Sequence, residues 1–322
     1  MSAVCVNPVT ILLVLLHCNF DVLVGLWVLL FFWALARFAE SGDERHWLLG
    51  TLCLGLAIWT KTVPLCLVPL TALGVRRLPK PVLFVGAVLV FAPVTIAMSV
   101  IYVLAPEAVF EYVIKYRSIS GYFGISGILY LIGLPSLGHI AGLLYQVAFL
   151  GALVWISVSA YRRESVETST LLGVILLLLI SIPVLGPGYA PQYAYWYLPL
   201  LAAYFHCAPK RVRFVLVLLY LTMAATFLVE YGLFASHGRF ALHLIPTKTV
   251  LSLSEAISTR GPQTLARLPL FLVYLLLLFQ IALRLRSDGE SQAEGAPPLA
   301  RSRHQRGDEG GGTPKGPNEP RP

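Results

Sequence analysis

The amino-acid sequence predicts an all-α protein: a polytopic transmembrane helical bundle of about ten membrane segments, some of them short or re-entrant. Of its 322 residues, 57% are hydrophobic and 12% are charged, against a charged share of about 25% in soluble domains. The apolar residues form continuous runs of membrane length that are rich in Leu and Val. A β-barrel would instead alternate at period two over strands of about ten residues.

The apolar runs predict the helices in chain order. Residues 1–17 match a signal peptide only in length, because no basic region precedes the apolar core, so they are read as a membrane segment. Three of the first four runs are shorter than the ~20 residues that a spanning helix needs. Short helices at membrane depth are tolerated where they line a cavity or pack inside protein. The predicted segments are 8–17, 22–38, 47–60, 63–75, 81–104, 138–158, 168–186, 190–206, 212–235 and 265–285.

Residues 47–75 are predicted to form a hairpin of two short helices with Lys61 and Pro64 near its tip. The segment is long for one straight span, and Pro64 disfavours helix at the preceding residue. A hairpin also places the basic loops on both sides of it in one compartment. By the positive-inside rule, that compartment is the cytoplasm. The loops so assigned are Arg37–Arg45, Arg76–Lys80, Arg162–Arg163 and Lys210–Arg213, together with the end of the last helix.

The chain divides into a transmembrane domain, residues 1–286, and a tail, residues 287–322, which is rich in Gly, Pro, Arg and Glu. Such a composition cannot bury enough apolar surface to offset its ordering entropy, so the tail is predicted to be disordered and cytoplasmic. The net charge of +8 follows from basic loops that face anionic lipid. We therefore predict membrane lipid as a partner and exclude nucleic acid.

Polar residues interrupt the apolar sequence at four places, and the threading puts all four on the extracytoplasmic side: 17–21, 60–64, 115–117 and 186–193. Asp21 is either a first-turn acid that complements the helix dipole or a carboxylate that faces a polar cavity. Lys61 is either the structural partner of Asp21, a lysine that snorkels to the interface, or a cation that meets a phosphate.

The other two interruptions also have two interpretations. Residues 105–127 fit an interfacial amphipathic helix, or a phosphate clamp of Lys115 and Arg117. The glycines that follow, Gly121, Gly124 and Gly127, would then form a flexible loop over a bound lipid. The cluster of aromatic residues at 189–197 is typical of an interfacial belt, in which Gln192 is the one amide able to bind a sugar hydroxyl. No metal-ligand spacing, Gly-rich phosphate loop or nucleophile motif is present in the sequence.

Four segments in this order resemble the GT-C glycosyltransferases, in the branch that uses polyprenyl-phosphate-mannose. Asn7-Pro8 followed by His17-Cys18-Asn19-Phe20-Asp21 is similar to the start of that pattern, and Leu54–Pro64 to its lysine- and proline-containing segment. Residues 116–127 resemble its extracytoplasmic loop, and Ala190–Pro199 its Pro-Gln-Tyr…Trp-x-Leu-Pro segment.

The resemblance implies a GT-C-like fold and a hexosyltransferase that moves a sugar, most simply mannose, from a polyprenyl-phosphate donor to a glycan or glycolipid acceptor at the extracytoplasmic face, with inversion. Lys61, Lys115 and Arg117 would bind the donor phosphate, and His17, Gln192 and Tyr193 the sugar or acceptor. No cofactor is fixed; a divalent cation, Mg or Mn, is left open. The multi-pass protein would lie in the plasma membrane of a prokaryote or the endoplasmic reticulum of a eukaryote.

The resemblance also implies a catalytic carboxylate in the first outward loop, a segment that would precede residue 1. The chain is therefore expected to be N-terminally incomplete, or to be a degenerate paralogue, or to use Asp21 as its catalytic acid. Two other classes of function compete with the enzyme. Broken helices with intramembrane charges also suit a transporter or lipid flippase, and a missing catalytic loop suits a non-catalytic GT-C-like subunit.

Overall fold

The computed structural model describes residues 21–109, 123–163, 165–186, 191–233 and 260–294. Every element among them is helical and none of these residues lies in a strand, so the prediction of an all-α bundle is confirmed. The predicted run 8–17 lies outside the described residues. In chain order the elements are α3 (Asp21–Ser41), α4 (Glu44–Thr60), η1 (Val63–Ala72), η2 (Val75–Arg77), α5 (Lys80–Leu104), α6 (Pro106–Val109), α7 (Gly124–Leu131), α8 (Pro135–Arg162), α9 (Thr168–Leu185), η4 (Pro191–Trp196), α10 (Leu198–Cys207), α11 (Lys210–Leu233) and α14 (Arg260–Glu294).

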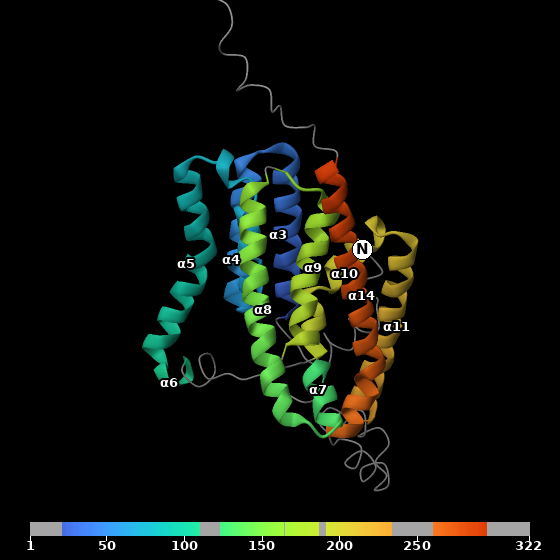
Figure 1. The fold of residues 1–322 in the computed structure, drawn as a ribbon. Helices are drawn as coiled ribbons and strands as arrows, with labels where there is room; N and C mark the ends of the chain where they lie inside the picture. Colours follow the sequence, from blue (N-terminus) through green and yellow to red (C-terminus); the bar gives the residue numbers. More distant parts are fainter. Residues whose placement is uncertain (1–20, 110–122, 164, 187–190, 234–259, 295–322) are drawn as a thin grey trace, which may run out of the picture. The chain divides into compact units, whose positions relative to one another are not determined.

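The predicted hairpin is present as α4 and η1, which run in opposite directions and are joined by Lys61 and Thr62 (Figure 1). The indole N–H of Trp47, near the start of α4, donates to the backbone carbonyl of Thr71, near the end of η1, at 3.0 Å. The second arm is a ten-residue 3₁₀-helix, which rises about 2.0 Å per residue instead of about 1.5 Å. This geometry lets ten residues return along most of the length of α4.

The basic loops meet at one end of the bundle, as predicted. The Gly74 N–H donates to the Arg163 carbonyl at 3.3 Å, which joins the loop after η1 to the loop after α8. The Thr168 hydroxyl donates to the Glu40 carboxylate at 3.4 Å, which joins the start of α9 to the end of α3. The first residue of α3 and the last residue of α4 consequently lie at the other end (Figure 1).

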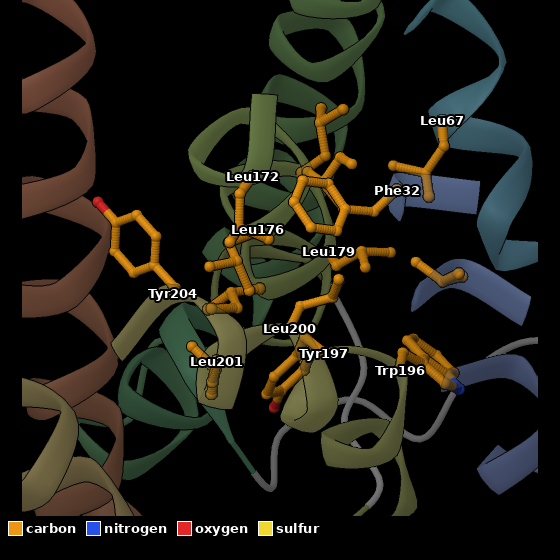
Figure 2. Packing of buried hydrophobic residues seen from close by; sticks show 14 of the residues in the cluster. Phe32, Leu67, Leu172, Leu176, Leu179, Trp196, Tyr197, Leu200, Leu201 and Tyr204 are labelled. Carbon is orange, nitrogen blue, oxygen red and sulfur yellow. The ribbon is translucent and has the colours of Figure 1, made fainter. Parts of the chain in front are cut away.

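Helix α9 lies in the core, whereas α5 and α8 carry exposed apolar surface. Five described helices are long and apolar enough to cross a membrane: α3, α5, α8, α9 and the Gly261–Ser287 part of α14. The most apolar window of α9 is 72% buried, but that of α5 is only 6% buried and that of α8 11%. Apolar faces of this extent mark contact with another apolar phase, and lipid is the one that suits helices of this length. Figure 2 shows the core around α9, where Leu172, Leu176 and Leu179 meet Phe32 and Leu67.

The glycines after residue 120 do not all form a flexible loop. Gly124 and Gly127 are buried in α7, so the expectation for them was wrong; Gly121 lies outside the described residues. Gly124 has a φ of +66°, and a Cβ at this position would collide with the backbone carbonyl of Val184 at the end of α9. A residue without a side chain lets the chain turn directly into α7 against α9.

The chain separates into two units, residues 1–285 and 286–322. Of the second unit, the structure describes only the last residues of α14, up to Glu294. The first residues of the segment predicted to be a tail are therefore helical, since α14 extends past residue 286. The rest of that segment lies outside the described residues.

Candidate functional site

An ion pair joins the first residue of α3 to Lys61, the residue that follows α4. The Lys61 ammonium donates to Asp21 Oδ1 at 2.7 Å. The side chain of Asp21 has no exposed surface, whereas that of Lys61 is 34% exposed. Lys61 leaves the helix with extended backbone angles while its N–H still bonds the Ala57 carbonyl. The antiparallel packing of α3 and α4 thus brings together two charges that lie 40 residues apart in the sequence.

Trp196 makes a second hydrogen bond to the carboxylate. Its indole N–H donates to the same Oδ1 atom of Asp21 at 2.8 Å, so one oxygen accepts bonds from two helices other than its own. Gly25, one turn after Asp21, faces the backbone of η4 so closely that a Cβ there would collide with the Tyr195 carbonyl. The missing side chain at Gly25 is therefore what allows η4 to lie against the first turns of α3.

Two aromatic rings form a platform beneath the ammonium. Tyr193 and Trp196 stack with their centroids 4.2 Å apart and their planes at 21°. They are three residues apart in a 3₁₀-helix, where positions i and i+3 eclipse each other. The Lys61 nitrogen lies 5.3 Å from the centroid of Tyr193 and 5.1 Å from that of Trp196, within the ~6 Å range of cation–π attraction.

These contacts hold the Lys61 side chain in place and leave part of it exposed. An ammonium group has three donors, and Asp21 accepts one of them, while the two rings stabilise the positive charge. Asp21 is neutralised by Lys61 and by its position in the first turn of α3, where the helix dipole favours an acid. The group best placed to meet a ligand is therefore the cation, and an anion such as a phosphate is the ligand that it would bind.

The structure brings together three of the predicted site residues, Asp21, Lys61 and Tyr193, as the preceding contacts show. The backbone of Gln192 belongs to η4, one residue before Tyr193; its side chain lies outside the described part of the chain. His17, Lys115 and Arg117 also lie outside the described residues, so their assignment stays a prediction.

Two polar residues at the same end of the bundle as Asp21 and Lys61 were not identified as site residues from the sequence. Trp196 was taken as part of an interfacial belt, although its N–H binds Asp21. Arg267 was not singled out in the sequence, yet it is only 5% exposed within α14 and lies near Phe123 and Gly124. Gln263 and Thr264, also buried, share its face of the helix one turn earlier. Three polar residues at this spacing in an apolar helix were the available signal, because such residues are usually functional.

Within the described ranges, no group of three or more His, Cys, Asp or Glu side chains could hold a metal ion. Comparison of the chain with protein-family models, with curated proteins and with solved structures finds no match.

Proposed function

We propose that the protein is a multi-pass integral membrane glycosyltransferase. It would move a sugar, with mannose as the first candidate, from a polyprenyl-phosphate donor to a glycan or glycolipid acceptor at the extracytoplasmic face. The basic loops at the opposite end of the bundle support this orientation, because Lys and Arg favour the cytoplasmic side.

The observation that carries the proposal is the meeting of three sequence motifs at one point. The Phe-Asp motif supplies Asp21, the Lys-x-x-Pro motif supplies Lys61, and the Pro-Gln-Tyr motif supplies the Tyr193–Trp196 platform. The resemblance to GT-C enzymes depends on the order of these motifs along the chain and makes no use of their distances. Their contact in space is therefore an independent argument that they serve one site.

The contacts suggest a distinct role for each side chain. Lys61 would bind the donor phosphate and stabilise the charge that develops on it as the leaving group. The rings of Tyr193 and Trp196 offer flat apolar faces of the kind that pack against a sugar. Asp21, buried behind them, would act as a positioning residue that holds Lys61 and Trp196; its role as the catalytic carboxylate stays a prediction.

The transfer itself is a single displacement. The acceptor hydroxyl oxygen attacks the anomeric carbon from the face opposite the phosphate, which inverts that centre. The bond from the anomeric carbon to the phosphate oxygen breaks, and polyprenyl phosphate leaves with the electron pair. A carboxylate base takes the hydroxyl proton, as general-base catalysis requires.

The test is transfer of labelled sugar. Membranes that contain the full chain are incubated with polyprenyl-phosphate-[³H]mannose, and label is measured in glycan and glycolipid fractions. We expect transfer above that of membranes without the protein, and a loss of about 10- to 100-fold in Lys61→Met, the range for a charged hydrogen bond. Lys210→Met removes an exposed lysine at the other end of the bundle and should leave the transfer rate unchanged.

The burial of Asp21 favours one alternative, a non-catalytic GT-C-like membrane subunit that binds the lipid-linked sugar and presents it to a partner. Binding of the donor to the purified chain, measured by equilibrium partition of the same labelled lipid, separates the two functions. Donor binding that needs Lys61, without transfer, would support the subunit. If neither binding nor transfer occurs, both functions are rejected.

A further inference from the structure

A groove of about 530 Å³ lies between η1 and α8, within the range of about 300–1,000 Å³ of small-molecule sites. Its walls run from Pro69 to Ala72 on one side and from Leu153 to Tyr161 on the other, and they are almost entirely apolar. Val154, at 65% exposed, and Val158, at 43%, leave it open along the flank of α8. A surface of this kind accommodates a hydrocarbon chain.

Arg76 lies at one end of the groove, against Tyr161. The Arg76 guanidinium lies 4.5 Å from the centroid of the Tyr161 ring, which itself lines the groove. Arg162 follows Tyr161 directly, and both arginines are exposed. The bond from the Gly74 N–H to the Arg163 carbonyl holds the two loops side by side. One end of the groove is therefore marked by Tyr161, whose ring contacts the Arg76 guanidinium and whose neighbour in the sequence is Arg162.

Two acidic side chains among the described residues, Glu40 and Glu167, have other partners. Glu40 forms an ion pair with Arg37 at 3.1 Å, and Glu167 accepts a hydrogen bond from the Ser169 hydroxyl at 2.6 Å. In the part of the chain that the structure describes, no carboxylate forms an ion pair with Arg76 or Arg162. Arginine is the side chain best suited to phosphate because its guanidinium donates two parallel hydrogen bonds.

The groove is separate from the cluster around Lys61. That lysine lies just before η1, whereas Arg76 follows the end of η1, in η2, and Arg162 ends α8. Ten residues of 3₁₀-helix span about 20 Å. A lipid whose phosphate lies at Arg76 is therefore in the leaflet opposite to the one that the proposed donor would occupy at Lys61.

We propose that this groove binds an anionic phospholipid of the cytoplasmic leaflet, with one acyl chain between η1 and α8 and the phosphate between Arg76 and Arg162. Basic pockets between membrane helices on the cytoplasmic side are known to hold anionic headgroups. The proposal requires insertion in a membrane but does not depend on sugar transfer. The bound lipid would fasten the short 3₁₀ arm of the hairpin to α8.

The test is native mass spectrometry of the full chain, released from detergent, with increasing phosphatidylglycerol or phosphatidylcholine. We expect phosphatidylglycerol to bind more tightly, and Arg76→Gln with Arg162→Gln to weaken its binding about 25-fold, from about fivefold for each cation. Lys210→Gln with Arg211→Gln removes two exposed cations that lie away from the groove and should keep the affinity.

A second variant and a soluble probe separate the contribution of the groove to lipid binding from that of the charges. Val154→Trp fills the groove without a change of charge and should also weaken phosphatidylglycerol binding. Glycerol phosphate, which lacks acyl chains, should not compete. Equal binding of both lipids, full affinity in the double arginine variant, or competition by glycerol phosphate would each overturn the proposal.

Discussion

Asp21 Oδ1 accepts hydrogen bonds from the Lys61 ammonium and the Trp196 indole, so these three side chains form one electrostatic unit. A carboxylate without exposed surface is costly unless its charge is compensated. The residues of this unit should therefore depend on one another in stability measurements, with or without a ligand.

A double-mutant cycle tests the ion pair. Asp21→Asn and Lys61→Met should each lower the free energy of unfolding by about 1–3 kcal/mol, because each leaves a charged or polar partner without its bond. The double variant should cost clearly less than the sum of the two. Thermal unfolding in detergent gives the four values. Additivity within about 0.5 kcal/mol would show that the two side chains do not interact.

Trp196→Phe isolates the indole hydrogen bond, since phenylalanine keeps a ring that stacks on Tyr193. We expect a loss of about 1 kcal/mol in the free energy of unfolding. Trp155→Phe is the matched control, because Trp155 is 69% exposed on α8 and its replacement should stay within about 0.5 kcal/mol. The assignment fails if the two substitutions have the same effect.

At the scale of the elements, glycines decide how closely helices approach. Gly25 admits the Tyr195 carbonyl of η4, Gly55 admits the backbone of α5 at Leu89, and Gly86 admits the Trp47 ring. At Gly25 and Gly55 a methyl group would meet backbone atoms, which cannot move without shifting a helix, and at Gly86 it would meet the ring of Trp47. The contact at Gly25 sets the distance between α3 and η4, and so the position of Trp196 beside Asp21.

Gly25→Ala should push η4 away from α3 and so separate Trp196 from Asp21. We expect a loss of about 1–3 kcal/mol in the free energy of unfolding, the range for overpacking, together with a change in tryptophan fluorescence. In Gly151→Ala the new methyl group on α8 would meet open space, so the free energy should stay equal or rise slightly because alanine favours helix. Equal stability of Gly25→Ala and the native protein would contradict the close approach.

Elements that are determined by local features of the sequence could be predicted, whereas contacts that depend on tertiary packing could not. The length of the apolar runs, and Pro64 between two of them, predicted the long helices and the hairpin, because bilayer thickness and proline geometry constrain the chain locally. Helix α7 lies in none of the predicted segments, and the predicted segment 190–206 consists of η4 and α10. The pairing of Asp21 with Lys61 was one of three interpretations of Lys61 that the sequence left open, and the structure shows this pair. The stacking of Tyr193 on Trp196 was not predicted, because it requires that residues 191–196 form a 3₁₀-helix. The bond from Trp196 to Asp21 depends on tertiary packing, which composition does not encode.

In the molecule as a whole, the proposed function requires that the two ends of the bundle face different compartments. The connections between helices separate into a basic end, with η2 and the end of α8, and a site end, with the Asp21–Lys61 pair (Figure 1). The positive-inside rule assigns the first to the cytoplasm. The exposed apolar faces of α5 and α8 run between the two ends and fit contact with lipid.

Cysteine accessibility tests this orientation. In a chain whose native cysteines are replaced by alanine, Thr62→Cys should react with an impermeant maleimide added to the extracytoplasmic side of sealed vesicles, because Thr62 is exposed beside Lys61. Lys80→Cys, exposed at the start of α5, should react only after the membrane is permeabilised. The reverse pattern would show that the orientation is opposite to the one proposed. Equal labelling of both cysteines before permeabilisation would show that no membrane separates the two ends.

Photocrosslinking is the most direct test of the central claim that motifs distant in the sequence form one site for a lipid-linked sugar phosphate. The full chain is irradiated with polyprenyl-phosphate-mannose that carries a photoreactive group on the sugar, and the labelled peptides are mapped. We expect label near Lys61 and near Tyr193, competed by the natural donor and reduced in Lys61→Met. Label confined to the basic end of the bundle, or unchanged by an excess of the natural donor, would contradict this claim.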